Sequence, residues 1–195
     1  MSDETQIGQS ESRRLVALST GVGEMPFGRD EYLDADEEAA KREALRLFNA
    51  AYEAQMGGEL DEAAGLYRQS LAAYPTAEAH TFLGWTYSFM QRTDDAIAEC
   101  LRAIEVDPDF GNPYNDIGAY LIEKGDPMGA VSWLRRAMNA PRYEALFYPH
   151  FNLGRVYEAE RRYFDALDQY DAALRLNPRY VLAARALRRL QSKVN

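Results

Sequence analysis

The chain has 195 residues, of which 47% are hydrophobic and 27% are charged, as in an average soluble globular protein. Its formal net charge of -9 disfavours partners that bind through phosphate groups, such as nucleic acid or an anionic membrane. The single cysteine, Cys100, excludes an intramolecular disulfide framework. One cysteine and two histidines, His80 and His150, argue against a zinc site. We therefore expect no metal and no other cofactor.

The first 33 residues form an acidic, glycine-containing segment whose composition is typical of disorder. Residues 1–40 hold ten acidic residues and three arginines, so most of the net charge lies there. Met1 to Glu11 is polar and lacks the apolar stretch of a signal peptide. No later stretch approaches the ~20 apolar residues that cross a bilayer. We expect a disordered acidic arm over residues 1–33, a cytoplasmic location and no membrane contact.

A repeated unit follows the arm. Its second half always contains an alanine at the same place, and these alanines stand 33, 34 and 36 positions apart, at Ala63, Ala96, Ala130 and Ala166. Its first half contains a small residue after an aliphatic one, at Leu83-Gly84, Ile117-Gly118 and Leu153-Gly154. Four copies with nearly constant spacing indicate a repeat architecture.

Each unit is predicted to form two helices. Apolar residues recur at steps of three and four, as in Leu83, Tyr87 and Met90, and turn residues divide the unit in two. Asp126 before Pro127 is the pattern of an N-cap with proline at the first helical position. No segment alternates with the period of two that a half-buried strand requires. The pattern indicates an all-α fold in which neighbouring helix pairs stack.

The sequence resembles the tetratricopeptide repeat family, whose unit reads W-x2-L-G-x2-Y, then A-x3-F, then P, in about 34 residues. The unit over residues 147–180 matches best, with the relevant positions filled by His150, Leu153, Gly154, Tyr157, Ala166, Tyr170 and Pro178. The resemblance implies a right-handed solenoid of antiparallel helix pairs. It divides residues 34–180 into four repeats, at about 44–76, 77–110, 111–146 and 147–180.

Residues 181–195 repeat only the first helix of a unit. Leu187 falls at the leucine position, but Arg188 stands where the family has a small residue, and an arginine there would block a further helix. Repeat arrays need polar ends, so we expect a C-terminal capping helix.

The resemblance also implies a concave groove lined by the first helix of each repeat. Carried over to this sequence, the groove positions include Phe48, Tyr52, Trp85, Phe89, Asn115, Tyr148, Phe151 and Arg155. Aromatic and arginine side chains are enriched in binding hot spots, so we expect the groove to bind a peptide or helix of a partner protein. For Phe48 and Tyr52 a second interpretation stays open, namely that the arm or a long first helix covers them as core.

An asparagine ladder that holds a peptide backbone is another feature of the family, because an amide both donates and accepts hydrogen bonds. Asn49 and Asn152 fit its positions, Asp116 is a near miss and Phe82 breaks the run. The ladder is therefore incomplete here, and it adds Asn152 to the candidate binding residues.

No catalytic motif is present: the sequence lacks a phosphate-binding loop, a nucleophile elbow and an H-E-x-x-H pair. His80 and His150 fall at one repeat position, which in the family packs between the two helices, and we expect them to be structural. We expect a buried, inert thiol at Cys100.

The function that we expect is a non-enzymatic scaffold or adaptor with a protein or peptide partner. In the alternative, the protein assembles with itself, and the groove receives another copy's residues 13–18 or capping helix. A helical-repeat RNA binder is a third possibility, which the acidic charge disfavours.

Overall fold

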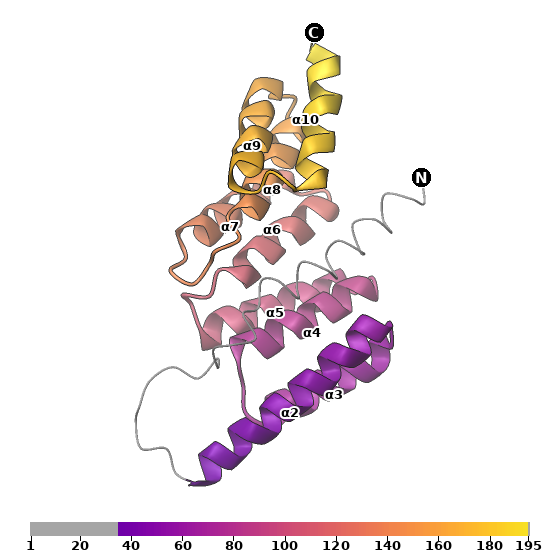
Figure 1. Ribbon diagram of the computed structural model, residues 1–195, viewed down its shortest axis with the longest axis vertical. Coiled ribbons are helices and arrows are strands. Elements are labelled where there is room, and N and C mark those ends of the chain that lie inside the picture. Colours follow the sequence, from indigo (N-terminus) through magenta and orange to yellow (C-terminus); the bar gives the residue numbers. More distant parts are fainter. Residues whose placement is uncertain (1–34, 195) are drawn as a thin grey trace.

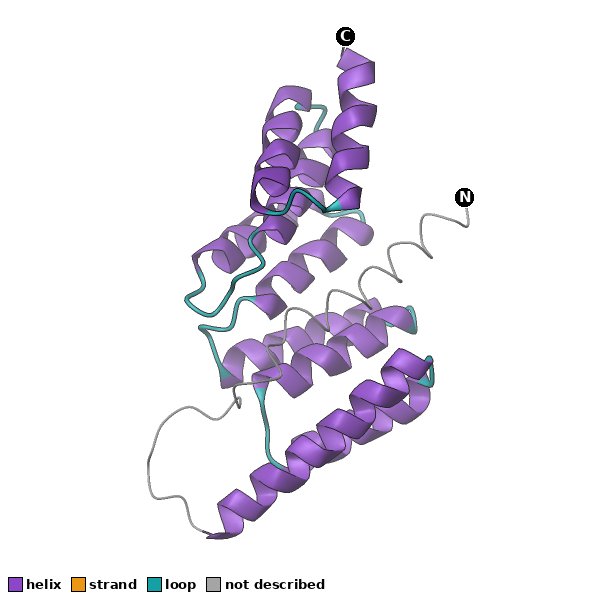
Figure 2. Cartoon of the chain, in the orientation of Figure 1, coloured by secondary structure: helices purple, strands orange, loops and turns teal. Residues whose placement is uncertain are grey.

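A computed structural model of the protein describes residues 35–194 (Figure 1). Within that range all regular secondary structure is helical (Figure 2). The helices are α2 (Ala35–Gly57), α3 (Leu60–Ala73), α4 (Ala77–Phe89), α5 (Thr93–Val106), α6 (Asn112–Glu123), α7 (Pro127–Asn139), α8 (Phe147–Ala159), α9 (Tyr163–Leu176) and α10 (Val181–Val194). This confirms the all-α expectation. The acidic arm expected over residues 1–33 lies outside the described residues.

The helices stack as pairs along the long axis of the molecule (Figure 1). Within the pairs, α2 contacts α3, α4 contacts α5, α6 contacts α7, and α8 contacts α9. The second helix of each pair also contacts the first helix of the next pair, and α10 packs on α9 at the end. The fold is the expected helical-repeat solenoid, in which each pair buries the apolar side of its neighbour.

The two helices of a pair cross where one side chain is almost absent. A Cβ atom added to Gly84 would lie 3.1 Å from the carbonyl oxygen of Ala96, and one added to Gly118 would lie 2.5 Å from Cδ2 of Leu134. The repeated alanines of the second helices are all 0% exposed: Ala63, Ala96, Ala130 and Ala166. The repeated small residues of the sequence are therefore the contact points of the pairs.

Side-chain caps fix the start of two helices. The carboxylate of Asp126 accepts a hydrogen bond from the N–H of Gly129 at 2.9 Å, and Pro127 is the first residue of α7, as the sequence predicts. Thr76 caps α4 in the same way by accepting from the N–H of Ala79 at 3.1 Å. Such caps satisfy backbone donors that have no partner within the helix.

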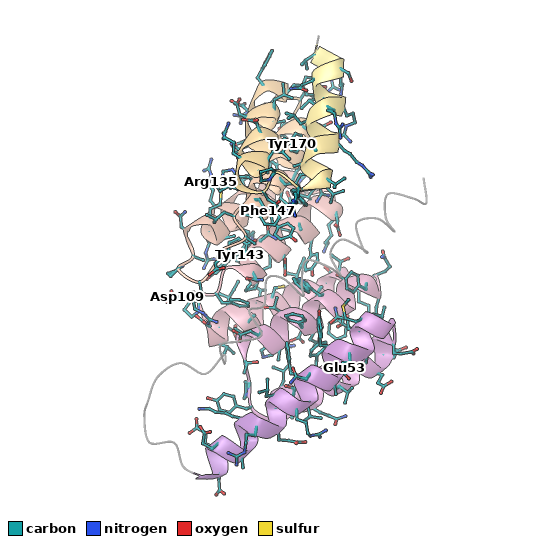
Figure 3. All side chains as sticks on the ribbon, in the orientation of Figure 1. Glu53, Asp109, Arg135, Tyr143, Phe147 and Tyr170 are labelled. Carbon is teal, nitrogen blue, oxygen red and sulfur yellow. The ribbon has the colours of Figure 1, made fainter. Side chains whose placement is uncertain are left out.

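The link between α7 and α8 folds back onto the link between α5 and α6. The N–H of Arg142 donates to the carbonyl of Asp109 at 3.0 Å, and its guanidinium pairs with Asp107 and, at 2.8 Å, with Glu78 on α4. Tyr143, labelled in Figure 3, packs so closely on Gly111 that a Cβ there would overlap it. The link therefore connects the second, third and fourth helix pairs.

Gly154→Ala is expected to lower the free energy of unfolding by about 1 to 3 kcal/mol, because the new methyl group would overlap the buried ring of Tyr170. Gly65→Ala is the matched control, since Gly65 is also helical but meets nothing within 4 Å. The control should raise the free energy of unfolding by up to about 1 kcal/mol. Urea denaturation followed by circular dichroism measures both changes. A stabilised Gly154→Ala variant would contradict the close crossing.

Candidate functional site

Three of the predicted groove residues belong to one aromatic cluster between α2, α3 and α4. The ring of Phe82 is 5.1 Å from Phe48, 5.8 Å from Tyr52 and 4.9 Å from Trp85. Phe48 also meets Tyr67 edge-on at 5.5 Å. Phe82 and Tyr67 are buried, whereas the three predicted residues are half-buried. These three side chains therefore stabilise the core on one side and keep part of their surface at the face of the first helices.

A second aromatic cluster joins α8 to the start of α10. Tyr180 lies 5.5 Å from Tyr148 and 5.2 Å from Phe151, and Phe151 is 5.7 Å from Tyr170. Phe147, which the sequence did not single out, completes the cluster at 5.1 Å from Tyr180 (Figure 3). The predicted residues Tyr148 and Phe151 are again half-buried.

Between the two clusters, a chain of polar side chains connects the first helices of three pairs; we call it the polar chain. The indole N–H of Trp85 donates to Oδ2 of Asp116, and the amide of Asn115 donates to Oδ1 of Asp116 at 3.3 Å. Asn152 donates to Oδ1 of Asn115 at 3.1 Å and accepts from the guanidinium of Arg155 at 3.2 Å. The polar chain therefore runs from α4 through α6 to α8.

Asp116 is the buried centre of the polar chain, with 8% of its surface exposed. Burial raises the pKa of its carboxyl group to about 7, although the hydrogen bonds from Trp85 and Asn115 act in the opposite direction. Both of these partners are neutral, so no cation compensates for the lost hydration of the carboxylate. Truncation of Trp85 would remove one of the two donors, so it would destabilise the fold as well as alter the surface.

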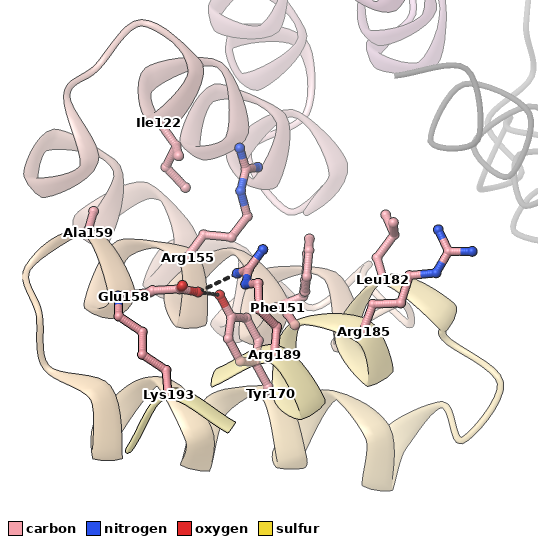
Figure 4. Close-up of a pocket in the computed structure, with 11 residues that line it drawn as sticks. Ile122, Phe151, Arg155, Glu158, Ala159, Tyr170, Leu182, Arg185, Arg189 and Lys193 are labelled. Carbon is pink, nitrogen blue, oxygen red and sulfur yellow. Dashed lines mark hydrogen bonds and ion pairs between the residues drawn. The ribbon is translucent and has the colours of Figure 1, made fainter. Parts of the chain in front are cut away.

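A groove opens at the C-terminal end of the stack, between α6, α8 and α10 (Figure 4). Its volume is about 510 Å³. Its lining comprises Ile122, Phe151, Arg155, Glu158, Ala159, Tyr170, Leu182, Arg185, Ala186, Arg189 and Lys193. We call it the α8–α10 groove. It combines an apolar floor with an edge of four cations and one carboxylate.

The carboxylate of Glu158 organises one side of the α8–α10 groove. It accepts from the hydroxyl of Tyr170 at 2.9 Å and pairs with the guanidinium of Arg189 at 2.7 Å (Figure 4). Burial raises the pKa of Tyr170, and the neighbouring Glu158 raises it further. These contacts connect α8, α9 and α10, so the capping helix is held at a defined place beside α8.

Two family models, both described as tetratricopeptide repeat, match the chain, one over residues 77–110 and the other over residues 147–180. The described helices pair and stack as such repeats do. The chain is a tetratricopeptide repeat protein. Tetratricopeptide repeats form scaffolds for protein–protein interaction, and this is the general function of the chain. No curated protein matches the sequence.

Among solved structures, the repeat protein is similar to PilF of Pseudomonas aeruginosa, with a TM-score of 0.73 and 21% identity over 80% of this chain and 70% of that chain. It is similar to PilW, described as a widely conserved type IV pilus biogenesis factor (TM-score 0.68, 17% identity, 82% and 70% covered). It is also similar to YrrB, described as having an unusual peptide-binding site (TM-score 0.60, 21% identity, 82% and 84% covered). At these identities the likeness shows the fold alone.

The structure brings some predicted binding residues of this repeat protein together and separates others. Phe151 and Arg155 line the α8–α10 groove, while Asn115 and Asn152 are buried in the polar chain and bonded to each other. Phe89 is half-buried near the end of α4. Sequence reasoning missed Leu182, Arg185 and Arg189 in the groove, although the excess of arginine after Asp171 was a visible signal.

The histidines and the cysteine pack as the family resemblance implies. His80 bonds to Glu99 across α4 and α5 at 2.7 Å, and His150 bonds to Gln169 across α8 and α9 at 2.8 Å. Cys100 is fully buried, and burial raises the pKa of its thiol well above the usual value. Among residues 35–194, no group of three or more histidine, cysteine or acidic side chains is arranged to hold a metal ion. None of the described helices is long and apolar enough to cross a membrane.

Because the pKa of Asp116 is about 7 in the folded protein, the unfolded chain loses this proton first as the pH rises. This group should therefore lower the free energy of unfolding by about 2 to 3 kcal/mol between about pH 5 and pH 8. Asp116→Asn removes the titrating group, so its free energy of unfolding should lack that decrease. Urea denaturation at both pH values tests the difference, and an equal pH dependence of the two proteins would contradict it.

Proposed function

We propose that this tetratricopeptide repeat protein is a non-enzymatic scaffold that binds a peptide or helix of a partner protein on the face of its first helices. The observation that carries the proposal is the α8–α10 groove, which has an apolar floor at Phe151, Ile122 and Leu182. Its volume of about 510 Å³ is within the range of ordinary ligand sites, roughly 300–1,000 Å³. In this proposal, residues 34–180 form four repeats, and α10 serves as a cap that also contributes to the binding face.

The half-buried aromatic side chains support binding along a longer part of the same face. Phe48, Tyr52 and Trp85 at one end, and Tyr148 and Phe151 at the other, keep part of their surface outside the core. Half-buried aromatic side chains of this kind lose little conformational entropy on binding, because packing already fixes them. Asn115 and Asn152 differ from the peptide-binding asparagines of the family's ladder, because their amide groups already form hydrogen bonds within the polar chain.

Self-assembly is the rival proposal. One observation concerns the version in which the groove receives the capping helix of another copy. The apolar side of α10 packs on α9 in the same chain, with Ala183, Ala186 and Leu190 buried. A groove of another copy would have to displace it from this position. Residues 13–18, the other proposed insert, lie outside the described residues. The oligomeric state, like the cytoplasmic location, stays a prediction.

The test selects short random peptides on the immobilised full chain and measures their affinity for variants. Leu182→Ser removes an apolar side chain from the groove and should weaken the selected peptides by roughly tenfold. Phe164→Ser is the control, because Phe164 is 76% exposed on α9 and does not line the groove. Circular dichroism checks that both variants fold. Equal affinities for Leu182→Ser and for the control would overturn the proposed site.

A further inference from the structure

The charge of the α8–α10 groove differs from that of the whole protein. Acidic residues outnumber lysine and arginine by 31 to 22 in the sequence, yet the groove is lined by four cations and one carboxylate. The cations are Arg155 on α8 and Arg185, Arg189 and Lys193 on α10. A local excess of positive charge on an acidic protein attracts a partner of opposite charge.

Within residues 35–194, two of the three guanidinium groups have no carboxylate partner. Arg189 is paired with Glu158, and Lys193 lies over the ring of Tyr163 at 4.5 Å. Arg155 donates only to the neutral amide of Asn152. Arg185 is exposed and forms no ion pair with the described residues. In Figure 4, Arg155 lies on one side of the groove and Arg185 on the other, with Phe151 between them.

This arrangement favours a ligand that carries both carboxylates and an apolar group. An arginine binds a carboxylate through two parallel hydrogen bonds, which gives direction as well as strength. An exposed ion pair contributes little free energy by itself, so the affinity must come from apolar burial. Phe151 and Leu182 offer that burial between the two arginines (Figure 4).

We propose that the α8–α10 groove binds an acidic peptide segment of a partner protein. One aliphatic or aromatic side chain of the segment packs on Phe151 and Leu182, and flanking carboxylates pair with Arg155 and Arg185. This inference rests on the proposed function and specifies the chemistry of its partner. A nucleic acid fits less well, because a long polyanion would extend beyond the groove over a protein with a net charge of -9.

The capping helix supplies a matched pair of variants for the test. Arg185 lines the groove, whereas Arg188, one turn further along α10, is also exposed but does not line it. Arg185→Glu and Arg188→Glu change the net charge equally, so a difference between them reports the position of the charge and not its amount. The side chain of Arg188 bonds only to the carbonyl of Ala184 on its own helix.

The probe is a library of short random peptides selected on the full chain. The enriched peptides should carry a net negative charge and at least one large apolar residue. A fluorescein-labelled member should bind Arg185→Glu roughly tenfold more weakly than the unaltered protein, and Arg188→Glu within about twofold of it. Its affinity should also fall when the salt concentration rises from about 0.05 M to 0.5 M.

The result that overturns the inference differs from the one that overturns the proposed function. If the enriched peptides need Leu182 but are neutral or basic, or if the two arginine variants behave alike, the acidic partner is wrong and the peptide groove stands. If no selected peptide depends on Leu182, the groove itself is wrong. A labelled oligouridine that binds the unaltered protein and not Arg185→Glu would replace the peptide with nucleic acid.

Discussion

At Gly84, Gly118 and Gly154, the first helix of a pair lies so close to the second that a single methyl group would press on the opposite helix. This close approach fixes the geometry within each pair, because the facing positions such as Ala96 and Ala130 are fully buried and leave no room for adjustment. Each pair then stacks on the next pair through its second helix. This packing leaves one face of the first helices exposed, and that face forms the α8–α10 groove together with α10.

The first helices of neighbouring pairs are held together by side-chain contacts that sequence patterns do not display. The polar chain from Trp85 to Arg155 spans three pairs and contains one buried carboxylate, Asp116, whose ionised form is costly in this environment. A polar chain that is fully bonded selects one alignment of neighbouring pairs more strongly than apolar packing alone, because a shifted alignment leaves a buried group without a partner. The alignment of α4, α6 and α8 therefore depends on these side chains.

The fold could be predicted from the sequence because the repeat shows itself in residues that the helix crossings require, such as the Leu153-Gly154 pair and Ala166. The candidate site was predicted only in part. Phe151 and Arg155 stand at groove positions of the last repeat, and Leu182 and Arg185 stand at groove positions of the cap, but the cap was interpreted only as a polar end and not as part of the groove. The bonds of Asp116 depend on which neighbours face it across pairs, and a repeat pattern does not specify that.

The capping helix illustrates how a structural requirement creates a chemical surface. α10 covers α9 on one side through Ala183, Ala186 and Leu190, and a capping helix needs polar residues on its other side. Any polar residues would meet that need. Here three of the six polar residues of α10 are arginines, and the bond from Arg189 to Glu158 holds this helix beside the apolar floor of α8. Acidic residues would keep this side of α10 polar equally well, but they would repel the carboxylates of the peptide that we propose as the partner.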